Sequence, residues 1–160
     1  MTSHNLPSIM LTPIASVQNS RAEVEDDNWG DVISILVLDP SLPEEALLGI
    51  ESFSHAEIIF YFHLVSDSKI ETGARHPRNN PDWPKVGILS QRGKNRPNRL
   101  GATIVKILKR EGRHLHVQGL DAVNGTPILD IKPVLQEFLP NEDVSQPQWA
   151  TELMKNYWQK

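Results

Sequence analysis

Short apolar runs, separated by clusters of Gly, Pro and Asn, recur along the middle of the chain. Residues 32–38 (VISILVL) form a β-branched run, and residues 56–64 (AEIIFYFHL) form a longer, aromatic and almost continuous one. A continuous run is expected for a strand that is buried on much of both faces. Further short strands are predicted at 86–89, 103–108, 115–120 and 127–131, with a hairpin turn at 111–113. The pattern predicts a mainly β fold, either a small barrel or a sandwich.

Two segments have helical rather than strand character. Residues 43–48 place Pro at the first helical position and acidic residues in the first turn, which favours a short helix. Apolar residues recur at helical spacing near the end of the chain and predict an amphipathic C-terminal helix over about 146–160. They are Trp149, Leu153, Met154, Tyr157 and Trp158. We expect their aromatic side to pack against the core or a second subunit. The length of 160 residues predicts a single domain over 1–160, with the barrel at about 8–140 followed by this helix.

The composition excludes several classes of protein. The chain contains no cysteine, which rules out disulfides, zinc–thiolate sites, iron–sulfur clusters and cysteine nucleophiles, and which favours a cytoplasmic location. No apolar run approaches the roughly 18 residues that a membrane helix needs. Polar residues interrupt the N-terminal region where a signal peptide would lie. We therefore expect neither membrane insertion nor secretion.

Motifs for several common chemistries are missing. His55 and His63 flank the most apolar strand and His114 and His116 lie in a predicted hairpin, but no HExxH pattern supplies a ligand set, so no metal site is expected. A GxSxG elbow is absent, which leaves a Ser-His-Asp hydrolase unsupported. The glycine loops GxGxxG and GxxxxGK[ST] are absent as well. If the protein handles a nucleotide, it does so on β structure.

The charge distribution points to an anionic ligand. The net charge is −4, yet residues 73–114 hold eleven Lys or Arg against only two acids, Asp82 and Glu111, a local charge of +9. The arginines of this block are Arg75, Arg78, Arg92, Arg96, Arg99, Arg110 and Arg113. Arginine suits forked hydrogen bonding to phosphate or carboxylate. The cations of 106–113 have an alternative interpretation as the solvated side of a hairpin, whereas 75–101 combines Arg, Asn, Gly and four prolines in a rigid, polar loop that favours ligand binding.

A second segment of interest is 119–133 (GLDAVNGTPILDIKP). A predicted strand ends near Asp121, and Asn124-Gly125 forms a turn that tolerates positive φ. Exposed backbone groups at such a turn can bind a small molecule. Asp121 and Asp130 are the notable carboxylates of the segment, and Asp130 has an alternative interpretation as a buried acid that pairs with Arg or with loop amides.

Four motifs occur in order along the chain: ESFSHAEIIFYFH, HPRNNPDWPKVGI, RPNRLG and GLDAVNGTPILDIKP. Together they resemble the TsaA-like (YaeB or TrmO type) family of S-adenosylmethionine-dependent tRNA methyltransferases, over about residues 8–140. The resemblance implies a small β-barrel that works as a homodimer, with the cofactor near the subunit interface. It also implies N6-methylation of the threonylcarbamoyl-modified adenosine next to the tRNA anticodon.

The resemblance implies a set of cofactor contacts in this chain. They fall on His63, Leu64, Arg92, Leu100, Asp121, Asn124, Gly125 and Thr126, with Ser20 and Arg21 in the region where the family has a Pro-Arg-Gln tripeptide. Arg92 or Arg96 is expected to bind the methionine carboxylate of S-adenosylmethionine. Asp121 is expected to bind the ribose or the cofactor amine, and it is the candidate catalytic base.

We call residues 75–101 the basic loop. RNA contacts are expected from this loop at Arg75, Arg78, Lys94 and Arg99, so tRNA binding should weaken with added salt. Compared with the bacterial members, the sequence lacks the tripeptide and has Asn124 where Asp is usual, and we expect it to lack their extra C-terminal domain. These departures leave two other functions open. One is a non-catalytic module that binds S-adenosylmethionine or RNA, and the other is methylation of a small molecule.

Overall fold

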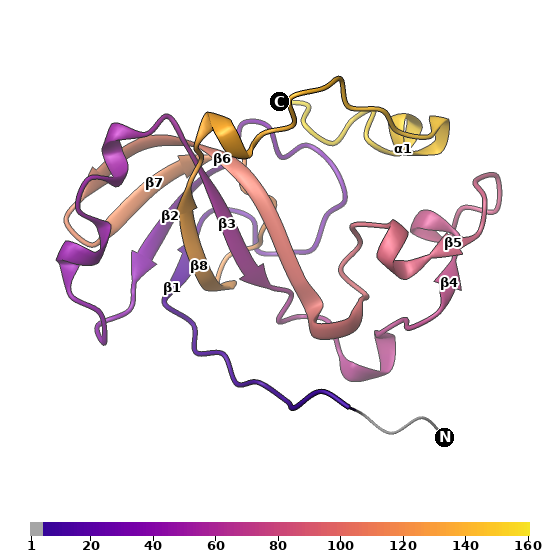
Figure 1. Ribbon diagram of the computed structural model, residues 1–160, viewed down its shortest axis with the longest axis horizontal. Coiled ribbons are helices and arrows are strands. Elements are labelled where there is room, and N and C mark those ends of the chain that lie inside the picture. The colour runs from indigo at the N-terminus through magenta and orange to yellow at the C-terminus, as the bar shows by residue number, and fades with distance from the viewer. Residues whose placement is uncertain (1–4) are drawn as a thin grey trace.

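Six strands of the part of the chain that the computed structural model describes, residues 5–160, close into an antiparallel barrel (Figure 1). Around the barrel they run β1 (Ala15–Gln18), β2 (Ile33–Leu38), β7 (His114–Gln118), β6 (Leu100–Glu111), β3 (His55–Tyr61) and β8 (Pro127–Pro133). The short strand β1, which the sequence pattern does not single out, completes the closure because it pairs with β2 on one side and β8 on the other. The expected mainly β barrel is confirmed.

The barrel core is built from alternate residues of each strand. In β3, Ala56, Ile58 and Phe60 are buried, whereas Glu57 and Ile59 are only half-buried. The prediction that this strand is buried on both faces is therefore wrong: its apolar run includes residues of the outer face. A closed antiparallel barrel has one interior face, so only every second side chain reaches the core.

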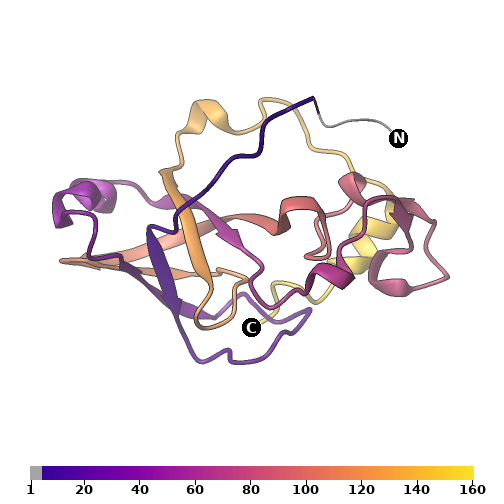
Figure 2. The same cartoon turned by 90° about the horizontal axis from the view of Figure 1, so that it is seen from below.

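A long excursion, residues 62–99, leaves the barrel between β3 and β6. It carries the two-stranded sheet of β4 (Ala74–Arg75) and β5 (Val86–Gly87), which projects from one side of the molecule (Figures 1 and 2). The strand predicted at 86–89 is thus shorter than expected, because the chain turns into a 3-10 helix at Ile88. The 3-10 helices of the chain lie at Glu44–Leu47, Ile50–Ser52, Asp67–Lys69, Pro77–Asn79, Ile88–Ser90, Pro97–Arg99 and Gln136–Phe138.

The C-terminal helix α1 (Gln148–Leu153) is shorter than the predicted 146–160. After it, the backbone of 156–159 forms hydrogen bonds with residues 28–30 instead of continuing the helical ladder. Tertiary pairing therefore ends the helix although the helical spacing of apolar residues continues. No helix among residues 5–160 is long and apolar enough to cross a membrane.

Candidate functional site

Asp121 lies at one end of the barrel, in the loop that joins β7 to β8. Its half-buried carboxylate is held by two hydroxyls from distant parts of the chain. Thr103 Oγ1, on β6, donates a hydrogen bond to Oδ1, and the Tyr157 hydroxyl donates one to Oδ2. An ionised carboxylate has about four acceptor positions. Asp121 therefore keeps free lone pairs for a ligand while its orientation is fixed.

The turn at Asn124 and Gly125 packs against the loop that follows β1. The Asn19 backbone N–H donates to Asn124 Oδ1 over 3.0 Å, and the Asn124 N–H donates to the Arg21 carbonyl over 2.7 Å. Gly125 has a φ of +85°, and among residues 5–160 a Cβ there would come within 4 Å of His63 Nε2 alone, at 4.0 Å. The structure thus brings the 19–21 loop, His63 and the Asn-Gly turn together, with open space beside Gly125.

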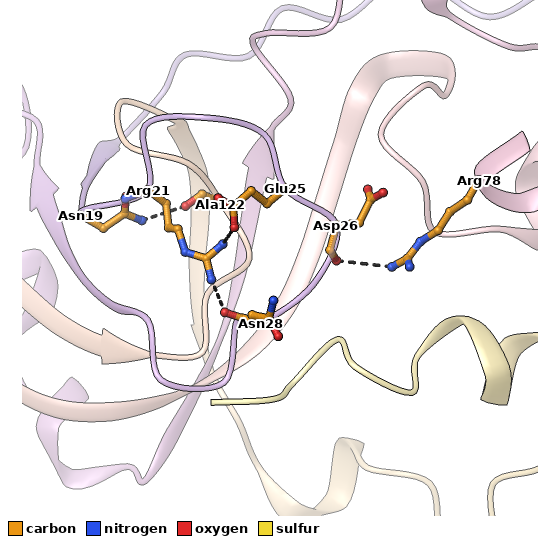
Figure 3. A network of polar contacts seen from close by, with 7 residues as sticks. All are labelled: Asn19, Arg21, Glu25, Asp26, Asn28, Arg78 and Ala122. Carbon is orange, nitrogen blue, oxygen red and sulfur yellow. Dashed lines mark hydrogen bonds and ion pairs between the residues drawn. The ribbon is translucent and has the colours of Figure 1, made fainter.

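Asn19 is the residue that anchors this loop to the barrel. Its side-chain amide donates to Ser34 Oγ over 2.9 Å and to the Ala122 carbonyl over 2.8 Å. Figure 3 shows the second of these bonds beside Arg21. Ser20, the neighbouring cofactor candidate, is exposed, whereas Thr126 is buried and its hydroxyl donates to the Val123 carbonyl. Thr126 therefore stabilises the turn from its buried side through this hydrogen bond.

Arg21 points toward the acidic loop of 23–28 rather than toward the Asn-Gly turn. Its guanidinium bonds to Glu25 and to the Asn28 carbonyl (Figure 3). The same guanidinium lies 4.5 Å from the centre of the Trp29 ring. Trp29 is 3% exposed. Arg21 thus stabilises the conformation of this loop through an ion pair with Glu25 and a cation–π contact with Trp29.

Arg92 and Arg96 occupy different surroundings. We call Asp121, Thr103 and Tyr157 the Asp121 cluster. The exposed Arg92 guanidinium donates to the carbonyl of Ala102, the neighbour of Thr103, and so lies beside this cluster. The half-buried Arg96 guanidinium donates to the Gln91 carbonyl within its own loop. Of the two candidates for a carboxylate contact, Arg92 is the better placed. Leu64 and Leu100 are exposed, at 57% and 37%.

The four candidate RNA contacts differ in their burial and in the carboxylates near them. Arg78 forms an ion pair of 3.0 Å with Asp27, and Arg99 is 3.2 Å from Asp67 and 4.9 Å from the centre of the Tyr61 ring. Arg75 is half-buried, with a buried Nε that has no hydrogen-bond partner among residues 5–160, and Lys94 is half-buried. Arg78 and Arg99 are thus partly neutralised by nearby carboxylates.

Sequence reasoning missed three polar residues of the site: Asn19, Thr103 and Tyr157. Burial and the neighbouring Asp121 charge raise the pKa of Tyr157, although the charges of Arg78 and Arg92 oppose this, so its hydroxyl stays protonated and remains a donor. Thr103 and Tyr157 carry no local signal for the site, because Thr103 belongs to a predicted strand and Tyr157 to a predicted helix, and neither pattern places a side chain beside Asp121. No group of three His, Asp or Glu able to hold a metal ion occurs within the described part of the chain.

The family model "tRNA-methyltransferase O N-terminal domain" matches residues 22–138. The barrel with its Asp121 and Asn-Gly cluster is therefore a domain of this class, and the chain belongs to the tRNA-methyltransferase O N-terminal domain family. This confirms the resemblance seen in the four motifs.

Individual relatives agree with this membership. A human protein named tRNA (adenine(37)-N6)-methyltransferase is 39% identical over 105 residues, which cover 66% of this chain and 23% of the human protein. A Methanothermobacter thermautotrophicus protein named "probable S-adenosyl-L-methionine-binding protein" is 36% identical over 93 residues, 58% of this chain and 64% of that protein. The crystal structure of TrmO from Pseudomonas aeruginosa superposes with a TM-score of 0.73 at 25% identity, covering 92% of this chain and 64% of that chain. The chain thus spans about a quarter of the length of the human relative.

Proposed function

We propose that this protein transfers a methyl group from S-adenosylmethionine to N6 of an adenosine in tRNA, the threonylcarbamoyl-modified adenosine next to the anticodon. The observation that carries the proposal is the match to the tRNA-methyltransferase O domain over 22–138, a range that includes Asp121, Arg92 and the Asn-Gly turn. Rat and mouse relatives that are 40% and 38% identical have the same name as the human one.

The residues at the site fit S-adenosylmethionine in charge. The cofactor has a cationic amine and sulfonium, an anionic carboxylate and ribose hydroxyls. The site offers the Asp121 carboxylate, the Arg92 guanidinium and the open backbone beside Gly125. We assign Asp121 to the ribose or amine, Arg92 to the carboxylate, and the turn at Asn124 to Thr126, with His63 and Leu64, to the adenosine side.

When bound, S-adenosylmethionine supplies an electrophilic methyl group. The contribution of the chain is chiefly to hold donor and acceptor together, since orientation supplies much of the rate of such a transfer. The methyl–sulfur bond would break as the N–C bond forms, with S-adenosylhomocysteine as the leaving group, and the acceptor nitrogen would lose a proton. Asp121 is the carboxylate to which we assign that proton. Because Thr103 and Tyr157 each occupy one lone pair of Asp121, either oxygen retains another for this role.

The basic loop, with Arg75, Arg78, Lys94 and Arg99, is the surface that we assign to the tRNA backbone. Phosphate contacts of this kind release counterions, so binding should fall steeply as salt rises. Arg78 and Arg99 already have carboxylate neighbours, Asp27 and Asp67. A phosphate would therefore have to compete with these ion pairs.

We further propose that the protein is a cytoplasmic homodimer. A small barrel offers limited concave surface, and a second copy would add walls to the site. Leu64 and Leu100, themselves candidate cofactor contacts, are exposed apolar side chains, and a second copy that packs against them would bury them. Light scattering should give twice the chain mass of 18.0 kDa at micromolar concentration, and a mass of one chain with cofactor present would contradict the dimer.

The experiment that tests the activity uses radiolabelled S-adenosylmethionine and total tRNA, prepared with and without the threonylcarbamoyl modification. We expect label in the modified tRNA and a large loss with Asp121→Asn, which keeps the size of the side chain but removes its charge. Label in neither tRNA, from folded protein that binds the cofactor, would reject methylation of this nucleoside.

The second candidate function is a non-catalytic module that binds S-adenosylmethionine. It is favoured by the names of the archaeal relatives, which state cofactor binding and no transfer reaction. Calorimetric binding of S-adenosylmethionine without methyl transfer to any RNA or small molecule would select it.

A further inference from the structure

The chain after α1 crosses the end of the barrel and lies beside the loop of residues 28–30; we call residues 154–159 the C-terminal strap. Its backbone accepts three hydrogen bonds from that loop. The N–H of Asn28 donates to Asn156, that of Trp29 to Tyr157 and that of Gly30 to Gln159, over 3.1, 2.8 and 3.4 Å. The strap is drawn in yellow in Figure 1 and passes beside Asn28 in Figure 3.

Gly30 makes this close approach possible. A Cβ on Gly30 would lie 2.1 Å from the carbonyl oxygen of Trp158, far inside any real contact. The obstacle is backbone, which cannot rotate away as a side chain would. A residue larger than glycine at position 30 is therefore incompatible with the docked strap.

A second anchor lies just before the strap, in α1. The Trp83 indole N–H donates to Glu152 Oε2 over 2.7 Å, which ties α1 to the excursion that carries the basic loop. The Tyr157 and Trp158 rings pack edge to face, with centroids 4.8 Å apart. The strap is thus held on both sides of Tyr157.

The consequence of this docking is the contact between Tyr157 and Asp121. Tyr157 is outside residues 22–138, the part of the chain that matches the family model, whereas Asp121 is inside it. With Thr103 bonded to one oxygen of Asp121 and Tyr157 to the other, the carboxylate plane is set by two donors from different elements. Loss of either donor would let the carboxylate rotate and add an entropic cost to ligand binding.

We propose that the C-terminal strap contributes Tyr157 as a positioning residue, which orients Asp121 to hold the ribose or amine of the cofactor. This inference rests on the proposed function, because it assigns Asp121 a role in cofactor binding. Tyr157 acts through Asp121 and needs no contact with the cofactor. The cofactor site would then extend beyond the domain that the family model describes.

Two variants test the inference by calorimetric titration with S-adenosylhomocysteine. Tyr157→Phe removes only the hydroxyl. Gly30→Ala displaces the strap, and Tyr157 with it, without changing the side chains of Tyr157, Thr103 or Asp121. We expect each to weaken binding about tenfold, in line with the loss of one hydrogen bond to a charged group. Tyr61→Phe is the matched control, since it also removes only a hydroxyl and keeps the ring that lies 4.9 Å from the Arg99 guanidinium, and it should bind like the parent protein.

A split between kinetic constants separates positioning from a merely structural role. Tyr157→Phe should raise KM for S-adenosylmethionine by a larger factor than it lowers kcat with saturating cofactor, whereas a loss of folded protein would lower the apparent kcat and leave KM unchanged. Unchanged affinity in Tyr157→Phe would overturn the inference. Tighter binding would also overturn it, because the strap would then compete with the cofactor for Asp121.

The contact can be tested separately from the cofactor. Tyr157→Phe and Asp121→Asn should lower the melting temperature non-additively, since both remove one interaction. If the parent protein binds no S-adenosylhomocysteine but this coupling is found, the proposed function fails and the positioning of a cofactor contact falls with it, although the strap contact stands. If the losses are additive while the parent binds the ligand, the inference fails alone.

Discussion

Phe60 on β3 and Gly101 on β6 are directly opposite partners in two neighbouring strands of the barrel, and the Phe60 ring lies over the glycine. A Cβ on Gly101 would be 2.5 Å from Phe60 Cζ, and Phe60 itself is 1% exposed. The ring therefore fills the space that a side chain at position 101 would take. Since the next residues of β6 include Ala102 and Thr103, this packing also supports the strand that reaches Asp121.

Replacing this glycine should destabilise the barrel. Gly101→Ala forces a methyl group into the Phe60 ring, and overpacking of a buried site typically costs about 1–3 kcal/mol of unfolding free energy. Urea denaturation should show this loss as a lower midpoint. Gly87→Ala is the control, because its φ is −59° and nothing lies within 4 Å of its Cβ position. Equal stability of the two variants would contradict the packing argument.

Arg78 joins the excursion to the acidic loop through Asp27. Both side chains are 27% exposed, so the pair should contribute no more than about 1 kcal/mol to stability. If Arg78 also contacts RNA, Asp27→Asn should free the guanidinium and strengthen tRNA binding, whereas Arg78→Ala should weaken it and reduce the salt slope by about 1. Filter binding over a salt series measures both. Weaker tRNA binding in both variants would show that the ion pair only orders the loops.

The location of Arg92 beside the Asp121 cluster predicts a specific loss of cofactor affinity. If Arg92 pairs with the cofactor carboxylate, Arg92→Ala should weaken S-adenosylhomocysteine binding about thirtyfold, or about 2 kcal/mol. Arg96→Ala should have the smaller effect, because the Arg96 guanidinium bonds within its own loop. Lys85→Ala, an exposed cation of the same excursion, serves as the charge control. A larger loss with Arg96→Ala would exchange the two assignments.

Acid should weaken the end of the barrel where Glu51 meets Arg110. The Arg110 side chain donates two hydrogen bonds of 3.0 Å to Glu51 and lowers the pKa of that carboxyl from 4.5 to about 2. Since the folded state favours the ionised form, the stabilisation is present above pH 4.5 and is lost as the pH falls toward 2. Thermal melts of Glu51→Gln and the parent protein should therefore differ at neutral pH and converge near pH 2. A difference that stays constant with pH would contradict this.

The short apolar runs between Gly, Pro and Asn clusters determined the barrel strands closely. Residues 32–38, 103–108 and 115–120 all overlap observed strands, because a run of apolar and β-branched residues favours an extended backbone locally. The four motifs similarly determined the family, since residues in the loops are recognisable without coordinates. Strand β1 was missed because four residues are too few to establish a pattern.

Only the tertiary structure decided which polar side chains meet. Asp121 could be picked out from its loop, but Thr103 and Tyr157 lie 18 and 36 residues away and join it through barrel closure and the docked strap. The apolar residues near the C-terminus have helical spacing. Their backbone groups nevertheless form hydrogen bonds with the 28–30 loop, because Gly30 allows the two segments to approach closely. Local propensity is a weak preference that such long-range contacts override, and one sequence contains no record of those contacts.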